Sequence, residues 1–450
     1  MDQGPILENS SQGTCEAWSC GEDLPQRGPT SLADRGPIAD DALISDVEVM
    51  PVDEFPKFVS VDDHVIEPAH VWQDWLPARF EDQAPRIERI PCSRMGYEGG
   101  LFTFETAEAG GTDCDWWRFE GDLWPCSRVE SAVGYDRSEV MIAPTTFEQM
   151  RPGCYDAKAR LEDMDDSHTE VQVMFPSTFP RFCGQRFSLA QDKELGLACL
   201  QAYNDWLVEE WCGDSGGRLV PLAIVPLWDP DLAAAEVARN AARGVRGIAF
   251  SEIPAYLGLP SIHTGHWNPL FAACAEAGVS VHMHIGSSST LPRTSDDAPP
   301  LVASTLTYGN AMASMVDYLL SGVLVDFPAL QLVYSEGQIG WIPYMLERLD
   351  KVWESNRAWG GVEDSVPEPP SNYFHRQIYG CFFDDEHGLT EESLKAIGAD
   401  RLLYETDYPH ADSTWPQCRE VAEAQMNHLD MDTITKITRG NAIELLGLDL

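Results

Sequence analysis

The chain has 450 residues, of which 73 are acidic and 30 basic, so its formal net charge is −43. A field of this sign repels nucleic acids and anionic membrane surfaces, and neither is expected as a partner. The sequence contains no apolar run of 18 residues, no basic and apolar leader after Met1 and no Cys-x-x-Cys pair. These features predict a cytoplasmic protein with reduced cysteines.

The N-terminal region, residues 1–54, is rich in Gly, Pro, Ser and acidic residues and has no sustained hydrophobic period. It cannot bury enough apolar surface to offset the entropy of ordering, which predicts an acidic, largely flexible tail. Residues 55–450 are expected to form the folded domain. At about 68–152, tryptophans alternate with glycines and acids, which predicts an irregular, aromatic-rich insertion. Because exposed aromatic patches mark contacts, we expect this insertion to cover the barrel mouth and to contribute to a homodimer.

Regular alternation of strands and helices follows residue 155. The expected strands are 58–64, 170–175, 219–226, 245–250, 279–285, 331–335, 377–383 and 401–406. Eight β/α units predict an α/β fold, a closed parallel (β/α)8 TIM barrel with a long insertion after the first strand. No Gly-x-Gly-x-x-Gly follows a strand and no P-loop occurs, which argues against a nucleotide-binding fold.

Histidines and carboxylates collect where four of these strands end. Asp62 and His64 end the first strand, His284 the fifth, Glu336 the sixth and Asp407 the eighth. Active sites of such barrels lie at the carboxyl ends of the strands, where these side chains converge. Nitrogen and oxygen ligands of this kind suit zinc or a similar divalent metal. Any one of these residues alone would fit an ordinary strand end, but together they predict a site.

Residues near these strand ends have other expected roles. Glu67 and His410 lie in loops at the same mouth, where we expect them to bind substrate. His282 lies one layer deeper than His284, which favours a buried core histidine. Asp63 points to the other face of the first strand and is expected to be structural. Glu336 is equally compatible with a helix-start acid and a base in the site.

At this point the chain resembles the amidohydrolase-related family that includes aminocarboxymuconate-semialdehyde decarboxylase and the dihydroxybenzoate decarboxylases. The resemblance covers residues 56–450 and is carried by the motifs at 61–68, 159–165, 281–288, 334–344, 405–410 and 439–442. These motifs include Val-Asp-Asp-His-Val-Ile-Glu-Pro, Val-His-Met-His-Ile-Gly-Ser-Ser and Glu-Thr-Asp-Tyr-Pro-His.

The resemblance implies one divalent metal held by Asp62, His64, His284 and Asp407, with Asp407 also transferring a proton. His284 and Glu336 complete the expected catalytic set. We expect zinc, with manganese or another transition metal as alternatives. Two departures from the family stand out: the first strand carries Asp62-x-His64, and Glu336 stands where decarboxylases usually place a histidine.

The expected function is that of a metal-dependent enzyme that removes carbon dioxide, without oxidation, from a small aromatic or unsaturated carboxylic acid. A metal-dependent hydrolase of an amide, ester or lactone is the alternative within the family. The substitution at Glu336 also leaves open a metal-free barrel that acts as a binding or scaffold protein.

Overall fold

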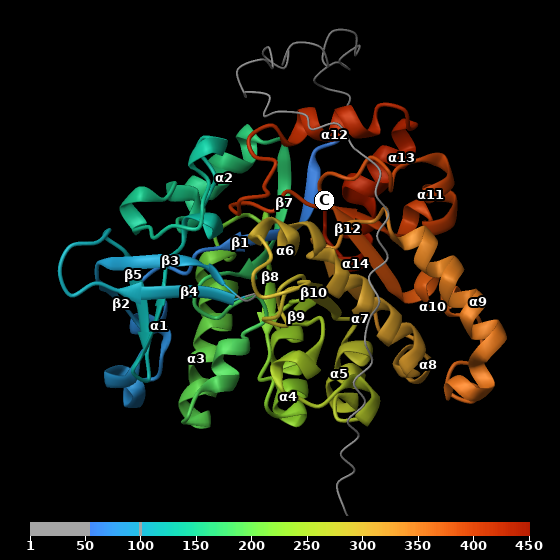
Figure 1. Cartoon of the computed structure of the whole chain (residues 1–450), viewed down its shortest axis with the longest axis horizontal. Coiled ribbons are helices and arrows are strands. Elements are labelled where there is room, and N and C mark those ends of the chain that lie inside the picture. Colours follow the sequence, from blue (N-terminus) through green and yellow to red (C-terminus); the bar gives the residue numbers. More distant parts are fainter. Residues whose placement is uncertain (1–54, 99–100) are drawn as a thin grey trace, which may run out of the picture. The chain divides into compact units, whose positions relative to one another are not determined.

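The computed structural model describes residues 55–98 and 101–450, so the predicted tail at 1–54 lies outside the described residues. Its centre is a parallel sheet of eight strands in the order β1-β7-β8-β9-β10-β11-β12-β13 (Figure 1). The predicted TIM barrel is therefore confirmed. The strands are β1 (Phe58–Val65), β7 (Thr169–Pro176), β8 (Leu219–Ile224), β9 (Gly247–Ser251), β10 (Ser280–His284), β11 (Leu332–Ser335), β12 (Ile378–Phe382) and β13 (Leu402–Tyr404).

The ring of strands closes between β1 and the segment that follows β13. The Asp407 amide donates to the Asp62 carbonyl at 2.9 Å, and the His64 amide donates to the Tyr408 carbonyl at 2.6 Å. These bonds bring the first and last strands of the barrel together although they are far apart in the sequence. They also place three candidate site residues on the closing seam.

Helices surround the strands, as the alternating pattern predicts (Figure 1). Several begin at an acidic or hydroxyl cap: the Asp156, Asp192, Asp229 and Thr390 side chains accept from backbone amides of the first turn. None of the helices in the described ranges is long and apolar enough to cross a membrane. The helices are α2 (Ala157–Asp166), α3 (Lys193–Trp206), α4 (Pro230–Ala241), α5 (Asn268–Ala277), α6 (Pro300–Leu306), α7 (Tyr308–Ser321), α8 (Val323–Asp326), α9 (Ile342–Gly360), α10 (Pro370–Gln377), α11 (Glu391–Ile397), α12 (Cys418–Met426), α13 (Met431–Thr435) and α14 (Asn441–Leu446).

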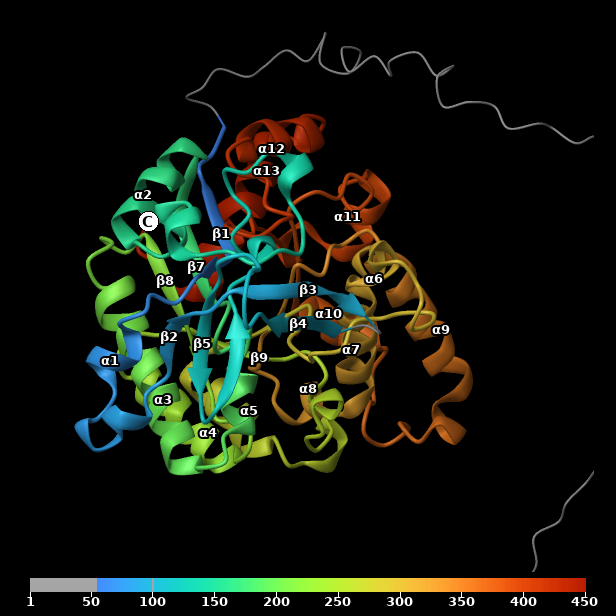
Figure 2. The ribbon, with the colours of Figure 1, turned by 60° about the vertical axis from the view of Figure 1, so that its left-hand side comes forward.

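The segment between β1 and β7 is more regular than expected. After α1 (Val71–Trp75) it forms an antiparallel sheet in the order β2-β5-β6 and a separate β3–β4 hairpin. Figure 2 shows these strands, coloured cyan, in front of the barrel. The strands are β2 (Arg86–Arg89), β3 (Cys92–Glu98), β4 (Leu101–Thr106), β5 (Asp115–Phe119) and β6 (Asp122–Pro125).

The expectation of irregular structure in this segment was wrong, and its central strand β5 was not recognised because it is buried on both faces. Trp116 packs with Cys92 and Cys114 in a small separate core, whereas the neighbouring Trp117 belongs to the main core. Trp117 stacks on Phe179, which follows β7, with ring centroids 5.2 Å apart. A strand buried on both faces lacks the alternation of apolar and polar residues by which a strand is recognised in sequence.

Candidate active site

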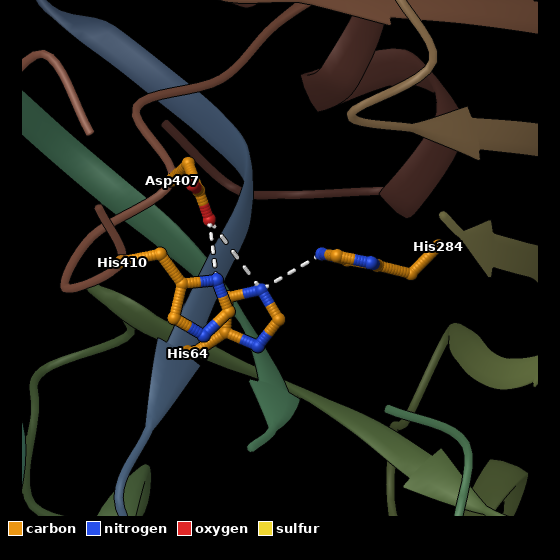
Figure 3. A group of neighbouring side chains, drawn as sticks. All are labelled: His64, His284, Asp407 and His410. Carbon is orange, nitrogen blue, oxygen red and sulfur yellow. Dashed lines mark hydrogen bonds and ion pairs between the residues drawn. The ribbon is translucent and has the colours of Figure 1, made fainter. Parts of the chain in front are cut away.

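Four ligand-capable side chains meet at the carboxyl ends of the barrel strands (Figure 3). His64 comes from β1, His284 from the last position of β10, and Asp407 and His410 from the segment after β13. One ligand atom of each lies within 4.8 Å of those of the other three, and all four residues are buried. The sequence predicts three of these residues as metal ligands and His410 as a substrate contact. Barrel closure therefore brings the predicted residues to one point.

The histidine tautomers leave lone pairs directed at this point. His64 Nδ1 lies 3.2 Å from the Pro176 carbonyl oxygen, and His284 Nδ1 lies 2.5 Å from the Ile285 carbonyl oxygen. A carbonyl oxygen only accepts, so each Nδ1 is assigned the proton. The two Nε2 atoms, 2.9 Å apart, then face each other as acceptors. Such an arrangement is favourable only when a cation lies between the two nitrogens, which fits a metal site.

Asp62 adds a carboxylate against both histidines. Its Oδ1 lies 3.3 Å from His64 Nε2 and its Oδ2 lies 3.4 Å from His284 Nε2. Within the part of the chain that the structure describes, no hydrogen-bond donor meets either oxygen of Asp62 or of Asp407, although all four oxygens are buried. Buried carboxylate oxygens are costly without a donor or a cation. The donor set of imidazoles and carboxylates fits a divalent metal ion.

Burial sets the protonation of the histidines. It lowers the pKa of His284 to about 3 and that of His410 to about 4. The pKa of His64 is also lowered well below its ordinary value, by burial and by the neighbouring His410 and His284. All three imidazoles are therefore neutral at pH 7, which is the form that binds metals.

The carboxylates of the site lack compensating cations of the chain's own. Burial raises the pKa of Asp62, Glu336, Glu405 and Asp407 well above the ordinary range, and repulsion among neighbouring acids adds to it. Within residues 55–98 and 101–450, no lysine or arginine forms an ion pair with any of the four. A bound cation would favour their ionised forms.

Glu336 lies at the edge of the cluster. Its Oε2 is 3.3 Å from His284 Nε2, and its backbone amide donates to both carboxylate oxygens of Glu405 at 3.1 Å. Glu336 has a φ of 57° and Asp407 a φ of 51°, a left-handed conformation that costs energy for residues with a Cβ atom. The fold thus holds both carboxylates in strained positions, one after β11 and the other after β13, as functional residues often are.

Glu67 is placed differently from its expected role. Its Oε1 accepts from the Ser177 amide at 2.8 Å, and its Oε2 accepts from the Thr178 and Phe179 amides at 3.1 and 3.0 Å. It is fully buried and is not among the described residues that line the cavity beside the cluster. Glu67 therefore anchors the loop after β7, and its geometry gives no support to the predicted contact with substrate.

His282 and Asp63 are both held by neighbouring side chains. His282 Nε2 lies 2.9 Å from Ser280 Oγ within the barrel, and burial lowers its pKa to about 3. Asp63 Oδ1 accepts from Gln172, from the Thr406 hydroxyl and from the Tyr408 amide. The structure thus places Asp63 as a link between β1, β7 and the segment after β13.

A cavity of about 500 Å³ opens beside the cluster. Glu336, Asp407 and His410 form part of its wall. The β3–β4 hairpin supplies Met95, Phe104 and neighbouring side chains, so the segment inserted after β1 shapes the cavity. The other lining residues include Trp124, Val129, Glu130, Thr178, Arg181, Phe182, Arg186, Ile285, Leu291 and Asp412.

Several residues of the site are not identifiable from the sequence motifs considered. Phe182 stacks on the His284 ring at 4.3 Å, and Arg181 and Arg186 line the cavity. All three lie between β7 and α3, in a segment without hydrophobic period or recognisable spacing. Glu405 belongs to the motif at 405–410, and the signal that could have identified it is an acid directly after the strongly apolar strand β13 (Leu402–Tyr404).

Comparison with known proteins agrees with this fold and site. The family model described as Amidohydrolase matches residues 69–448. A gamma-resorcylate decarboxylase of Rhizobium sp. (strain MTP-10005) is 27% identical over 285 residues, which cover 57% of this chain and 79% of the relative.

Solved structures show the same fold. An amidohydrolase from Mycobacterium avium subsp. paratuberculosis K-10 matches with a TM-score of 0.62 and 23% identity over 87% of this chain and 99% of its own. A dihydroxybenzoic acid decarboxylase from Polaromonas sp. JS666, with bound manganese and the inhibitor 2-nitroresorcinol, matches with a TM-score of 0.53 and 17% identity over 87% of this chain and 97% of its own. Since the family model spans most of the chain and the barrel carries a metal-compatible cluster at its strand ends, this protein is an enzyme of the amidohydrolase family.

Proposed function

We propose that the protein is a metal-dependent, non-oxidative decarboxylase of small hydroxylated aromatic acids. The observation that carries the proposal is the buried cluster of His64, His284, Asp407 and His410, whose acceptor atoms face one another beside an aromatic-lined cavity. The curated relatives support the choice of reaction, because those that match are gamma-resorcylate decarboxylases.

The proposed ligands are Asp62, His64, His284 and Asp407. A divalent ion held there supplies positive charge against the carboxylate and hydroxyl oxygens of the substrate. Zinc fits the nitrogen and oxygen donors, and manganese is the alternative, since it is bound in the related decarboxylase from Polaromonas. Elemental analysis of the purified protein distinguishes the two. Less than about a tenth of an equivalent of any transition metal would favour the metal-free scaffold instead.

In this reaction the side chains of the protein move one proton. Asp407 donates a proton to the ring carbon that carries the carboxylate. The bond between that carbon and the carboxylate then breaks, its electron pair returns to the ring, and carbon dioxide leaves. His410 Nδ1, 3.0 Å from Asp407 Oδ1, is placed to return a proton to Asp407, and its Nε2 lies 3.1 Å from Ser177 Oγ. Glu336 lies on the cavity wall, where it can orient the substrate.

The fate of a solvent proton tests this reaction. The metal-loaded protein is incubated in deuterated water with 2,6-dihydroxybenzoate, and carbon dioxide and the aromatic product are followed. We expect one deuterium at the carbon that carried the carboxylate. Carbon dioxide release that is absent for a panel of hydroxybenzoates, together with hydrolysis of an aryl ester or lactone, would replace decarboxylase by hydrolase. Asp407→Asn is the matched variant, because it keeps the shape of the side chain but cannot supply the proton.

The proposed assembly is a homodimer to which the segment at 68–152 contributes. Leu101 and Phe102, in the β3–β4 hairpin, expose 57% and 45% of their surface. Contiguous apolar groups of this kind are favoured at contacts between proteins. Light scattering at micromolar concentration tests this proposal: a particle of twice the 50.0 kDa chain mass is expected, and a particle of the chain mass would contradict it.

A further inference from the structure

Among the residues that the structure describes, Arg186 is a cation of the cavity wall that has no ion-pair partner. Arg186 lines the cavity, and its guanidinium lies over the Trp124 ring at 4.2 Å from the ring centroid. Its Nη1 atom is buried and has no hydrogen-bond acceptor. No ion pair joins Arg186 to any acid of the described ranges, although the chain has 73 acidic residues. Burial lowers the pKa of this guanidinium well below its ordinary value.

The other charged side chains of the cavity wall have a partner, belong to the cluster or face solvent. Arg181 forms an ion pair with Glu130 at 2.9 Å. Glu336 and Asp407 belong to the cluster at the strand ends, and Asp412 is exposed to solvent. Among the described residues, Arg186 is therefore the cavity-lining arginine that forms no direct ion pair, although Glu130, Glu67 and Asp122 act on its charge from farther away. A guanidinium nitrogen that is buried without an acceptor, as Arg186 Nη1 is, is costly unless a ligand supplies the opposite charge.

The surroundings of Arg186 also favour a flat, anionic ligand. A guanidinium binds a carboxylate through two parallel hydrogen bonds, and stacking on Trp124 fixes its plane. Phe104, Trp124 and Phe182 line the same cavity with aromatic surface. A ring with a carboxylate directed at Arg186 would satisfy both the charge and the apolar surface.

We propose that Arg186 binds a second carboxylate of the substrate, so that the substrate class is an aromatic dicarboxylate. This inference rests on the proposed decarboxylation, in which the carboxylate that leaves lies at the cluster of His64, His284 and Asp407. The remaining carboxylate would then stay bound to Arg186 and hold the ring in place. Arg186 thus becomes the residue that separates dicarboxylates from monocarboxylates.

Binding measurements test this inference without relying on turnover. The metal-loaded protein is titrated by calorimetry with benzoate, isophthalate and terephthalate, which lack the ring hydroxyl and serve as probes. We expect at least one dicarboxylate to bind about 10- to 100-fold more tightly than benzoate, the range for a charge-assisted pair of hydrogen bonds. Arg186→Met should remove most of this preference, and Arg186→Lys, which keeps the charge, should restore part of it.

Arg246→Met is the matched control. Arg246 is half-buried like Arg186, but it precedes β9 at the opposite end of the barrel and donates to the Ala241 and Val245 carbonyls. It should leave the preference unchanged. Thermal unfolding of each variant shows whether it is folded, and Arg186→Lys remains informative if Arg186→Met does not fold.

The outcomes separate this inference from the proposed function. Equal binding of benzoate and both dicarboxylates, no binding of either dicarboxylate, or a preference that survives Arg186→Met would overturn the role of Arg186. A preference that depends on Arg186 supports it, even where neither a hydroxylated benzoate nor a hydroxylated benzenedicarboxylate releases carbon dioxide. In that case the assignment as a decarboxylase fails and the dicarboxylate site stands.

Discussion

His282 and His284 lie two residues apart on one strand, and we expect them to have different roles. His284 ends β10 and contributes Nε2 to the cluster, whereas His282 lies within the barrel and bonds Ser280. Both are buried, so burial alone does not distinguish them. The difference lies in what each imidazole faces: an acceptor-rich cluster beside a cavity, or the hydroxyl of a neighbouring residue in the packed interior.

His284→Ala should remove the metal and lower activity by more than about 100-fold, beyond the loss expected for an outer partner of a ligand. The fold should persist, because the side chain lies at the rim. His282→Ala should instead lower the free energy of unfolding by about 2–4 kcal/mol through the void it leaves. Elemental analysis, turnover and thermal unfolding of both variants check this contrast. Full activity and retained metal in His284→Ala would contradict it.

Glu252, at the end of β9, gives a prediction for pH. Burial raises its pKa from 4.5 to about 7, while Gly286, Ser288 and Asn310 donate to its Oε1. Between pH 4.5 and 7 the folded protein therefore keeps a proton that the unfolded chain releases. Stability from this group is present at low pH and is lost as the pH rises through this window, by up to about 3 kcal/mol.

Glu252→Gln should remove this contribution to the pH dependence, since the amide is neutral and can still accept at its oxygen. Melting temperatures of the chelator-treated wild type and variant are compared from pH 5 to about 8, so that metal binding does not enter. The advantage of the variant should grow as the pH rises. A difference independent of pH would refute the role given to Glu252.

At the scale of elements, the loop after β7 connects the barrel to the cavity. Glu67 holds three consecutive amides of this loop, 177–179, and Phe182 a few residues later stacks on His284. A loop without regular backbone pairing depends on such side-chain acceptors for its conformation. Glu67 thus acts on the site through the loop that it fixes.

Glu67→Gln should place an amide group against backbone amides and lose at least one of these bonds. We expect the free energy of unfolding to fall by about 1–3 kcal/mol and kcat/KM to fall with it. Glu108→Gln, at an exposed position in the inserted segment, is the control and should change neither quantity. Unchanged stability in Glu67→Gln would show that the loop is held by other contacts.

The elements of the barrel were predictable from the sequence, and the walls of the cavity were not. The expected strand 170–175 is observed as Thr169–Pro176, and the expected strand 58–64 as Phe58–Val65. Strands buried on both faces form apolar runs of recognisable length between helices. The cavity depends instead on residues such as Arg186 and Trp124, which lie in different parts of the chain and become neighbours only through tertiary packing.

The strand-end residues were predictable for a related reason. A barrel places the carboxyl ends of all its strands at one face, so Asp62, His64, His284, Glu336 and Asp407 could be grouped without coordinates. Their distances and protonation could not be foreseen, because they depend on tautomers and burial. The role of Glu67 in anchoring the loop was not predicted. Its partners are backbone amides, and no residue type or spacing in the sequence indicates such partners.

For the whole molecule, the charge of −43 is the dominant electrostatic property. Mutual repulsion of surface carboxylates opposes the compact state, and salt screens it, since the Debye length falls from about 30 Å at 0.01 M to about 3 Å at 1 M. The melting temperature of the metal-loaded protein should therefore rise by several degrees across this range of sodium chloride. A constant or falling melting temperature would show that local ion pairs outweigh the net charge.

The closing seam of the barrel also has a consequence for biosynthesis. The ribosome synthesises the chain from its N-terminus. Strand β1, with Asp62 and His64, therefore emerges long before Asp407 and His410. A nascent chain that has not reached β13 holds only part of the cluster and lacks the bonds that close the ring. Metal acquisition is therefore tied to complete translation, and a chain ending at residue 400 should carry no metal by elemental analysis. The metal should therefore bind only after the first and last strands of the barrel have come together.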